Sequence, residues 1–499
     1  MRRDKPLFLE DTDALRRDLL ETDGRRASLF AMLLRSVRAA PENFAWHAPF
    51  AALVTRDPAD IDAARRMVRI YMEKLEPMSF CSGLQFHFWC FAFPHAKMAL
   101  AFQWLCTLGA FEPDEEERIR RRFVEYHFIN FFYGLRTKPD PECVDNQVLS
   151  LALSAALVGV LFGEGEAPGE TARLMRDEGL ARLPGLLGAM DPSGYSGEGS
   201  SYMDCVNGPA IPLAIELLER TGGETGLLDR PFPPGGARPG DVLRMVARSF
   251  MPGGLLLPWD NYGYQFGVRS TLAYGAKKTG EPLFAWLLEN ACIPTYDIGI
   301  GWAYDDLPWM LAWMPTEPAP ADCPLAWSHD RLGGALVSRD RLRYGALLWD
   351  DSTPRIPTRA HVNPAMVLFN GYGVPLSADG SPGPTGVPRF QFDDTWRTLH
   401  HFIGTTPASN YGDGCAGAHS VLLVDGKESM RAWSDGPQHG PVDCRPDDGI
   451  LSADVTPIYR ENVPDVRAVA RKLQLHGDCF FTLEDLFVQL TGEGFDVSG

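Results

Sequence analysis

The sequence has no apolar stretch long enough to cross a membrane, since no run of 18 or more apolar residues occurs in its 499 residues. Residues 1–26 carry positive charge but no apolar core of a secretory signal. The ten cysteines are scattered and form no C-x-x-C pair, which excludes a disulfide framework or a zinc ribbon and favours reduced thiols. We therefore expect a cytoplasmic protein with no membrane partner, or a periplasmic or secreted one if the N-terminus has been trimmed.

The chain also has few basic residues relative to acidic ones. It has 47 Lys and Arg against 65 Asp and Glu, a formal net charge of −18. This charge disfavours nucleic acid and anionic membranes as partners, and an anionic substrate would need a local basic site. The chain lacks a G-x-G-x-x-G after a strand, a P-loop and a G-x-S-x-G elbow, so nothing supports a nucleotide cofactor.

The first part of the chain contains a series of helical patterns. Each is about one helix long, and Pro, Gly or Asp separates it from the next. The patterns cover residues 11–40, 58–77, 93–111, 114–135, 145–164 and 208–223. This succession predicts an array of αα-hairpins, either a solenoid or a closed toroid. The absence of a fixed-period repeat disfavours the solenoid.

The texture changes at residues 313–330, where several prolines fall close together and the helical period stops. Short β-rich runs follow, broken by turn residues, which is typical of an antiparallel sandwich. They cover residues 334–351, 365–380, 419–430 and 466–490. A chain this long exceeds one ordinary core. We place a boundary at 316–326, between a helical domain (1–316) and a sandwich domain (326–499). The chain stops on an apparent strand start, so we expect the sandwich to be incomplete at its C-terminus.

Two histidines and an aspartate stand at marked places in the β-rich part. His361 precedes an apolar strand, a glycine, a second strand and Asp379-Gly380, and His419 opens a strand that runs into Asp425-Gly426. From spacing alone, hydrogen bonding across strands is the commoner explanation for such residues. Together with the helical first half, however, the pattern resembles the heparinase II/III-like polysaccharide lyases, a superfamily that includes exolytic alginate lyases.

The resemblance implies an α+β multidomain fold, with an N-terminal (α/α) toroid followed by an antiparallel β-sandwich. It also implies that His361, Asp379 and His419 bind one divalent metal. Two imidazoles and a carboxylate suit zinc, and the role of the metal there would be structural.

The helical part carries a second family feature, an Asn near a helix start and a Tyr downstream in a Gly- and Ser-rich stretch. The matching residues are Asn146 and Tyr202. Where relatives often have catalytic histidines, this chain has Gln147 and Arg359. Without the resemblance, Asn146 fits a helix cap and Tyr202 a half-buried packing residue.

The resemblance implies β-elimination at C4 of a uronate-containing oligo- or polysaccharide. That reaction must neutralise the carboxylate, remove the C5 proton and protonate the departing O4. Asn146, assisted by Gln147, suits the first task, and Tyr202 suits the other two. A tyrosine of ordinary pKa, about 10, needs a nearby cation to ionise, and Arg359 is the candidate.

Several further residues are candidates for substrate binding because they combine flat apolar faces with hydrogen-bonding tips. They are Glu198, Trp259, Asp260, Tyr264, His87 and His401. His95, near His87, fits a satisfied core histidine better. Two other functions remain open: a toroidal glycoside hydrolase that uses paired carboxylates such as Glu198, Asp204 or Asp260, and a non-catalytic carbohydrate binder. The sequence leaves open which uronate glycan is bound, whether cleavage is endolytic or exolytic, and whether the protein forms a homodimer.

Overall fold

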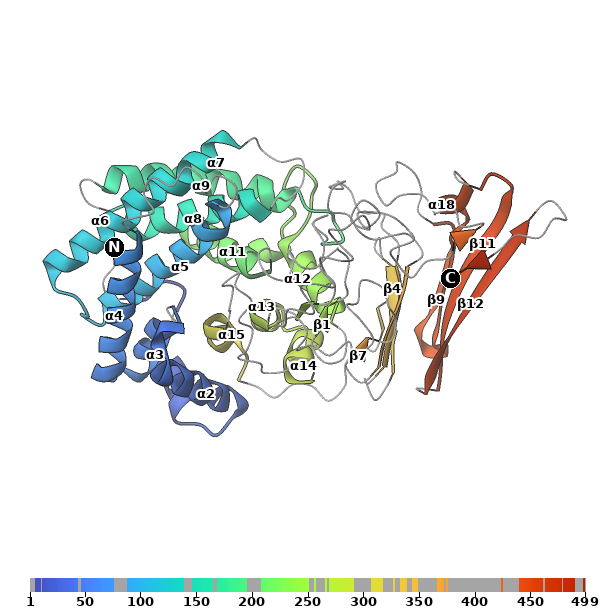
Figure 1. Ribbon diagram of the computed structural model, residues 1–499, viewed down its shortest axis with the longest axis horizontal. Helices are drawn as coiled ribbons and strands as arrows, with labels where there is room; N and C mark the ends of the chain where they lie inside the picture. The colour runs from blue at the N-terminus through green and yellow to red at the C-terminus, as the bar shows by residue number, and fades with distance from the viewer. Residues whose placement is uncertain are drawn as a thin grey trace.

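The computed structural model describes most of the helical part and the framework of the sheets (Figure 1). The described residues are 5–9, 11–43, 46–75, 88–138, 146–164, 168–194, 208–250, 255–256, 265–266, 269–290, 307–316, 326–327, 333–338, 343–348, 366–371, 374–375, 423–424, 439–460, 463–477, 479–489 and 497–498.

The part before residue 316 is mostly helical (Figure 1). Its α-helices are α1 (Thr12–Leu20), α2 (Arg25–Ala39), α3 (His47–Thr55), α4 (Pro58–Leu75), α5 (Phe88–Thr107), α6 (Pro113–His127), α7 (Tyr133–Thr137), α8 (Asn146–Phe162), α9 (Gly169–Gly188), α11 (Gly208–Gly222), α12 (Pro239–Arg248), α13 (Arg269–Thr279), α14 (Pro282–Asn290) and α15 (Leu307–Trp313). Short segments between them are the 3-10 helices η1 (Pro41–Asn43) and η6 (Leu227–Asp229) and the π-helix η4 (Phe128–Phe132), and β1 (Leu255–Leu256) pairs with β2 (Gln265–Phe266).

Local chemistry sets several helix ends. The Asp11 side chain accepts a hydrogen bond from the Ala14 N–H at 2.8 Å, which caps α1. The helical pattern of residues 11–40 is divided at Gly24 into α1 and α2. In α7 the last helical residue is Thr137, and Lys138 has an extended backbone because Pro139 follows it.

Helix α8 lies at the centre of the helical part and is buried on all sides, in contact with α5, α6, α9 and α11. Glycines bring α8 and α9 unusually close together. A Cβ added at Gly179 of α9 would lie 2.6 Å from the Ala152 carbonyl oxygen of α8. A Cβ at Gly159 of α8 would lie 2.4 Å from the Ala172 carbonyl oxygen of α9. The two backbones can approach this closely only because neither position carries a side chain.

The succession of helix contacts closes on itself, because the last helix, α15, packs against α2 and α3. Arg26 of α2 donates through Nε to the carbonyl oxygen of Leu311 in α15 at 2.7 Å. Arg25 forms an ion pair of 2.8 Å with Glu289 of α14. The N-terminal segment adds to this closure, since the Phe8 ring meets the Trp309 ring edge-on at 6.0 Å.

The part after residue 316 consists mainly of small antiparallel sheets. One sheet has the order β3 (Ala326–Trp327), β4 (Gly333–Val337), β5 (Arg343–Leu348), β6 (Met366–Gly371) and β7 (Val374–Pro375). A second has the order β12 (Phe480–Gln489), β11 (Val466–His476), β10 (Ile450–Asp454) and β9 (Val442–Arg445), with η9 (Pro446–Asp448) and α18 (Thr456–Arg460) beside it. A third pairs β13 (Val497–Ser498) with β8 (Leu423–Val424).

The two larger sheets share one hydrophobic core, in which Leu336 and Leu347 of the first sheet meet Leu473 of the second. They pack tightly at Gly345 of β5, where an added Cβ would lie 2.9 Å from the Phe481 ring of β12. The buried core of the helical part, from Phe8 to Met314, is a separate cluster. The boundary expected at 316–326 falls between these two cores.

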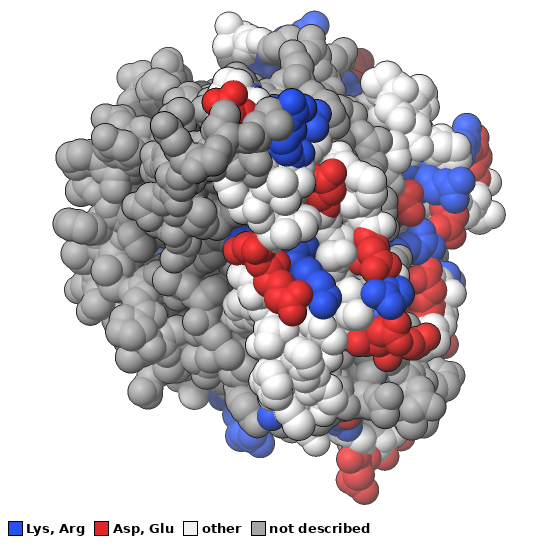
Figure 2. Space-filling model, turned by 90° about the vertical axis from the view of Figure 1, so that its right-hand side faces the viewer, with Lys and Arg blue, Asp and Glu red and all other residues white. Residues whose placement is uncertain are grey.

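A hydrogen bond connects the helical part to the first sheet. The Tyr344 hydroxyl of β5 donates to the Arg248 carbonyl oxygen of α12 at 3.3 Å and so joins the first sheet to the helical part. Figure 2 shows the sheet end of the molecule, where basic and acidic side chains lie in neighbouring positions. Within the second sheet, the buried Arg471 of β11 forms an ion pair of 2.8 Å with Asp485 of β12. Of the helices that the structure describes, none has the length and apolar character of a membrane span.

Candidate functional site

Two of the predicted site residues, Asn146 and Gln147, stand at the start of α8. Gln147 is half-buried, and its Oε1 accepts a hydrogen bond from the ammonium of Lys138 at 2.5 Å. Arg182 of α9 holds the other side of this corner, donating to the carbonyl oxygens of Leu135 at 2.6 Å and Lys138 at 2.9 Å. The start of α8 is therefore attached to α7 and, through Arg182, to α9. Sequence reasoning did not single out Lys138.

The other predicted site residues lie outside the described residues, and their positions stay predictions. They are Tyr202, Arg359, Glu198, Trp259, Asp260, Tyr264, His87, His401 and the metal ligands His361, Asp379 and His419. The alternative carboxylate Asp204 lies there too.

The described strands nevertheless fit the pattern around the expected metal ligands. The segment between His361 and Asp379 contains β6 and β7, which pair antiparallel with Gly371 opposite Val374. The segment after His419 contains β8. Within the described residues, no three His, Cys, Asp or Glu side chains form a group that could hold a metal ion.

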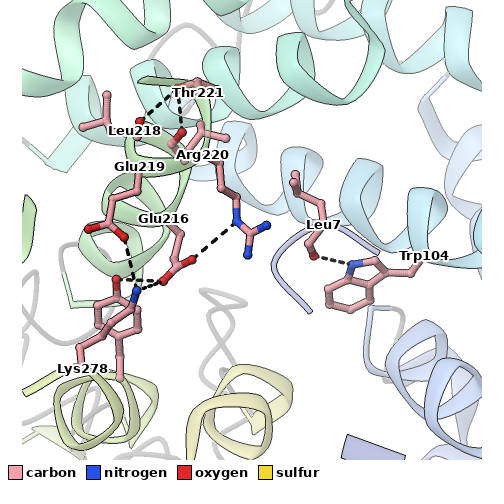
Figure 3. A network of polar contacts seen from close by, with 10 residues as sticks. Leu7, Trp104, Glu216, Leu218, Glu219, Arg220, Thr221 and Lys278 are labelled. Atoms are coloured by element: carbon pink, nitrogen blue, oxygen red, sulfur yellow. Dashed lines mark hydrogen bonds and ion pairs between the residues drawn. The ribbon is translucent and has the colours of Figure 1, made fainter. Parts of the chain in front are cut away.

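A polar network joins α11 to α13 (Figure 3). Glu216 is almost fully buried, and its Oε1 receives the Lys278 ammonium at 2.7 Å and the Tyr274 hydroxyl at 3.2 Å. Lys278 also lies 3.4 Å from Glu219, and the Arg220 Nε lies 3.6 Å from Glu216.

Burial, reinforced by the Glu216 charge, raises the pKa of Tyr274. A phenol with a raised pKa stays protonated near neutral pH and cannot accept a proton, so this tyrosine does not suit proton abstraction. The Glu216 carboxylate already has an ammonium and a hydroxyl as partners. The arrangement therefore suits a structural clamp between α11 and α13 better than a catalytic pair of acids.

A second titratable cluster lies where α4, α5 and α6 meet. His95 is fully buried, its Nδ1 lies 2.8 Å from the Tyr71 hydroxyl, and its Nε2 lies 3.2 Å from the Phe123 carbonyl oxygen. Because a carbonyl only accepts, Nε2 carries the proton and Nδ1 accepts from Tyr71. Burial lowers the pKa of His95 to about 4. His95 is thus a satisfied core histidine, as its sequence context favoured.

The comparisons with known proteins show a fold and no sequence relative. No family model matches the chain, and no curated protein matches it. Among solved structures, a crystal structure of heparinase III matches with a TM-score of 0.50 and 11% identity, over 89% of this chain and 61% of that one. A heparinase III gene product with methylated lysines matches with a TM-score of 0.44 and 12% identity, over 89% of this chain and 62% of that one.

The chain therefore has a heparinase II/III-like fold. It spans about three fifths of the length of the heparinase III chains that it matches. At this level of identity the likeness concerns the fold alone.

Proposed function

We propose that this protein is a polysaccharide lyase that cleaves uronate-containing glycans by β-elimination. The observation that carries the proposal is the fold, because heparinase III, itself a polysaccharide lyase, shares it over 89% of this chain. The closed succession of helix contacts from α2 to α15 supports the (α/α) toroid that such a lyase would use. The position of Asn146 at the start of α8 agrees with the family pattern.

In the proposed reaction, each required task has one residue of this chain. Asn146, assisted by Gln147, donates hydrogen bonds to the uronate carboxylate and so makes the C5 proton more acidic. The Tyr202 phenolate removes that proton, and the resulting phenol protonates the departing O4. Arg359 supplies the positive field that lowers the pKa of the phenol. The C4–O4 bond breaks as the C4–C5 double bond forms.

The reaction type can be tested with a panel of uronate polymers and oligomers, including alginate and glycosaminoglycans. A lyase produces an unsaturated sugar that absorbs in the ultraviolet, whereas a hydrolase produces reducing ends without new absorbance. We expect absorbance to rise with at least one uronate substrate. New reducing ends without a rise in absorbance would show that the protein is a hydrolase and not a lyase. Binding of the oligosaccharide in calorimetry without any cleavage would show that it is a non-catalytic carbohydrate binder.

We further propose that His361, Asp379 and His419 hold one zinc ion that stabilises the sheets. The donor set of two imidazoles and one carboxylate suits zinc, which would act there as a structural cross-link between strands. Metal analysis of the purified protein should give about one equivalent of zinc per chain, and His361→Ala should lose most of it. Retention of a full equivalent by His361→Ala would exclude this ligand set.

A further inference from the structure

The hydrogen bond between Lys138 and Gln147 links the C-terminal end of α7 to the first turn of α8. The two residues are nine apart in sequence, and their side chains meet at 2.5 Å. A hydrogen bond from an ammonium is stronger than one between neutral groups. The first turn of α8, which begins at Asn146, is therefore held by a charged donor from the preceding helix.

The Lys138 side of this contact is itself fixed. Pro139 forces an extended backbone on Lys138, and the Arg182 guanidinium binds the carbonyl oxygens of Leu135 and Lys138. Because Arg182 belongs to α9, the base of Lys138 is anchored to a helix that packs along α8. Lys138 thus connects the end of α7, which Arg182 of α9 also binds, to the start of α8.

The described partner of the Lys138 ammonium is a neutral group. Lys138 is half-buried, and its ammonium donates to the neutral amide of Gln147. By contrast, Arg136, two residues earlier, is exposed and lies 3.4 Å from Glu178. In a chain of net charge −18, a half-buried cation beside the first turn of α8 is the kind of local basic site that an anionic substrate needs.

We propose that Lys138 is a positioning residue for the uronate carboxylate: it fixes Gln147, and through it the first turn of α8, where Asn146 stands. This inference rests on the proposed function. It does not extend to Arg136, whose described partner is Glu178 of α9. The role belongs to the transition state, where charge on the carboxylate increases as the C5 proton leaves.

The test compares Lys138→Met, Lys138→Arg and the control Arg136→Met on a uronate oligosaccharide that the wild-type chain cleaves. Loss of a charge-assisted hydrogen bond should lower kcat of Lys138→Met about 10- to 100-fold with a smaller change in KM. Lys138→Arg should recover most of the loss, since a guanidinium also donates to an amide oxygen. Arg136→Met should keep kcat within about twofold and change KM alone, because an exposed charge acts by attraction.

A second readout needs no substrate. Hydrogen exchange of the backbone amides in residues 146–150 should be about tenfold faster in Lys138→Met than in wild type or Arg136→Met. Unchanged exchange together with a kcat within twofold of wild type would overturn the proposal. If the wild-type chain cleaves no uronate substrate, the proposed function fails instead. In that case the exchange rates alone decide whether Lys138 positions the start of α8.

Discussion

At the scale of single residues, His127 is the least expected feature of the helical part. It is fully buried at the end of α6, directly before the π-helix η4, and neither ring nitrogen has a hydrogen-bond partner in the described structure. Its ring lies 5.5 Å from that of His95. Burial and the neighbouring His95 lower the pKa of His127 well below its usual value. Both rings must therefore be neutral in the folded protein.

This histidine pair makes the stability of the helical part depend on pH. Unfolded histidines bind protons below about pH 6.5, whereas folded His95 does not until about pH 4. Between these values the unfolded state binds more protons, so stability falls as the pH falls. We expect a loss of up to about 1.4 kcal/mol per pH unit for each histidine. Thermal unfolding followed by circular dichroism at pH 7.5, 6 and 5 measures it.

His127→Phe isolates the effect, because it removes two orphan polar atoms and one titrating group while it keeps an aromatic ring. We expect this variant to unfold at a higher temperature than wild type at pH 5 and to depend less on pH. His476→Gln is the control, since His476 lies on β11 in the sheet part. A wild-type unfolding temperature that stays constant from pH 7.5 to 5 would contradict this interpretation.

Sequence reasoning accounts for some residues at this scale and not for others. The aromatic-rich context of His95 favoured a satisfied core histidine, and its two partners confirm this. The partnerless state of His127 depends on residues that meet only in three dimensions, so local pattern could not predict it. The same holds for Lys138, whose partner Gln147 lies across a helix boundary.

At the scale of elements, the close contact of α8 with α9 offers a direct test. Gly179→Ala would place a Cβ 2.6 Å from the backbone of Ala152 and Ala156, and the backbone cannot yield as a flexible side chain would. We expect the free energy of unfolding to fall by about 1–3 kcal/mol, the usual cost of overpacking. Urea unfolding followed by far-ultraviolet circular dichroism measures the change.

The matched control is Gly185→Ala on the same helix. An added Cβ there meets nothing within 4 Å, and the position is exposed. Because alanine favours a helix over glycine, this variant should gain about 0.5–1 kcal/mol. Equal effects of the two substitutions would show that helix propensity, and not the contact with α8, decides the stability at Gly179.

Two helices with interior prolines differ from the prediction, although α11, which contains Pro212, was predicted to within a residue. The helical pattern predicted over 93–111 is shifted relative to α5, which runs from Phe88 to Thr107 and contains Pro94. Helix α9, which contains Pro184, was not among the predicted helices. Both helices lie in the buried core, where packing outweighs the roughly 3 kcal/mol that an interior proline costs. Helices without such breaks, such as α4 and α8, were predicted to within a few residues.

At the scale of the whole molecule, the order of helices followed by strands was readable from periodicity, because each part has its own repeating pattern. The closure of the helical part was not readable in the same way. Arg26 and Leu311 are 285 residues apart, and nothing local in either segment indicates that they meet. The succession of helices left a solenoid or a closed toroid open, and the resemblance implied the toroid. In the structure α15 contacts α2 and α3, so the first and last helices of the helical part meet.

In the proposed reaction, Tyr202 of this chain takes the C5 proton of a uronate and then protonates the departing O4. The most direct measurement is the ultraviolet absorbance of unsaturated product, followed side by side for the wild-type chain and Tyr202→Phe at equal oligosaccharide binding. We predict a rise with wild type and a loss of at least about 1,000-fold with Tyr202→Phe, since the phenol serves as both base and acid. Undiminished turnover by Tyr202→Phe would contradict the claim.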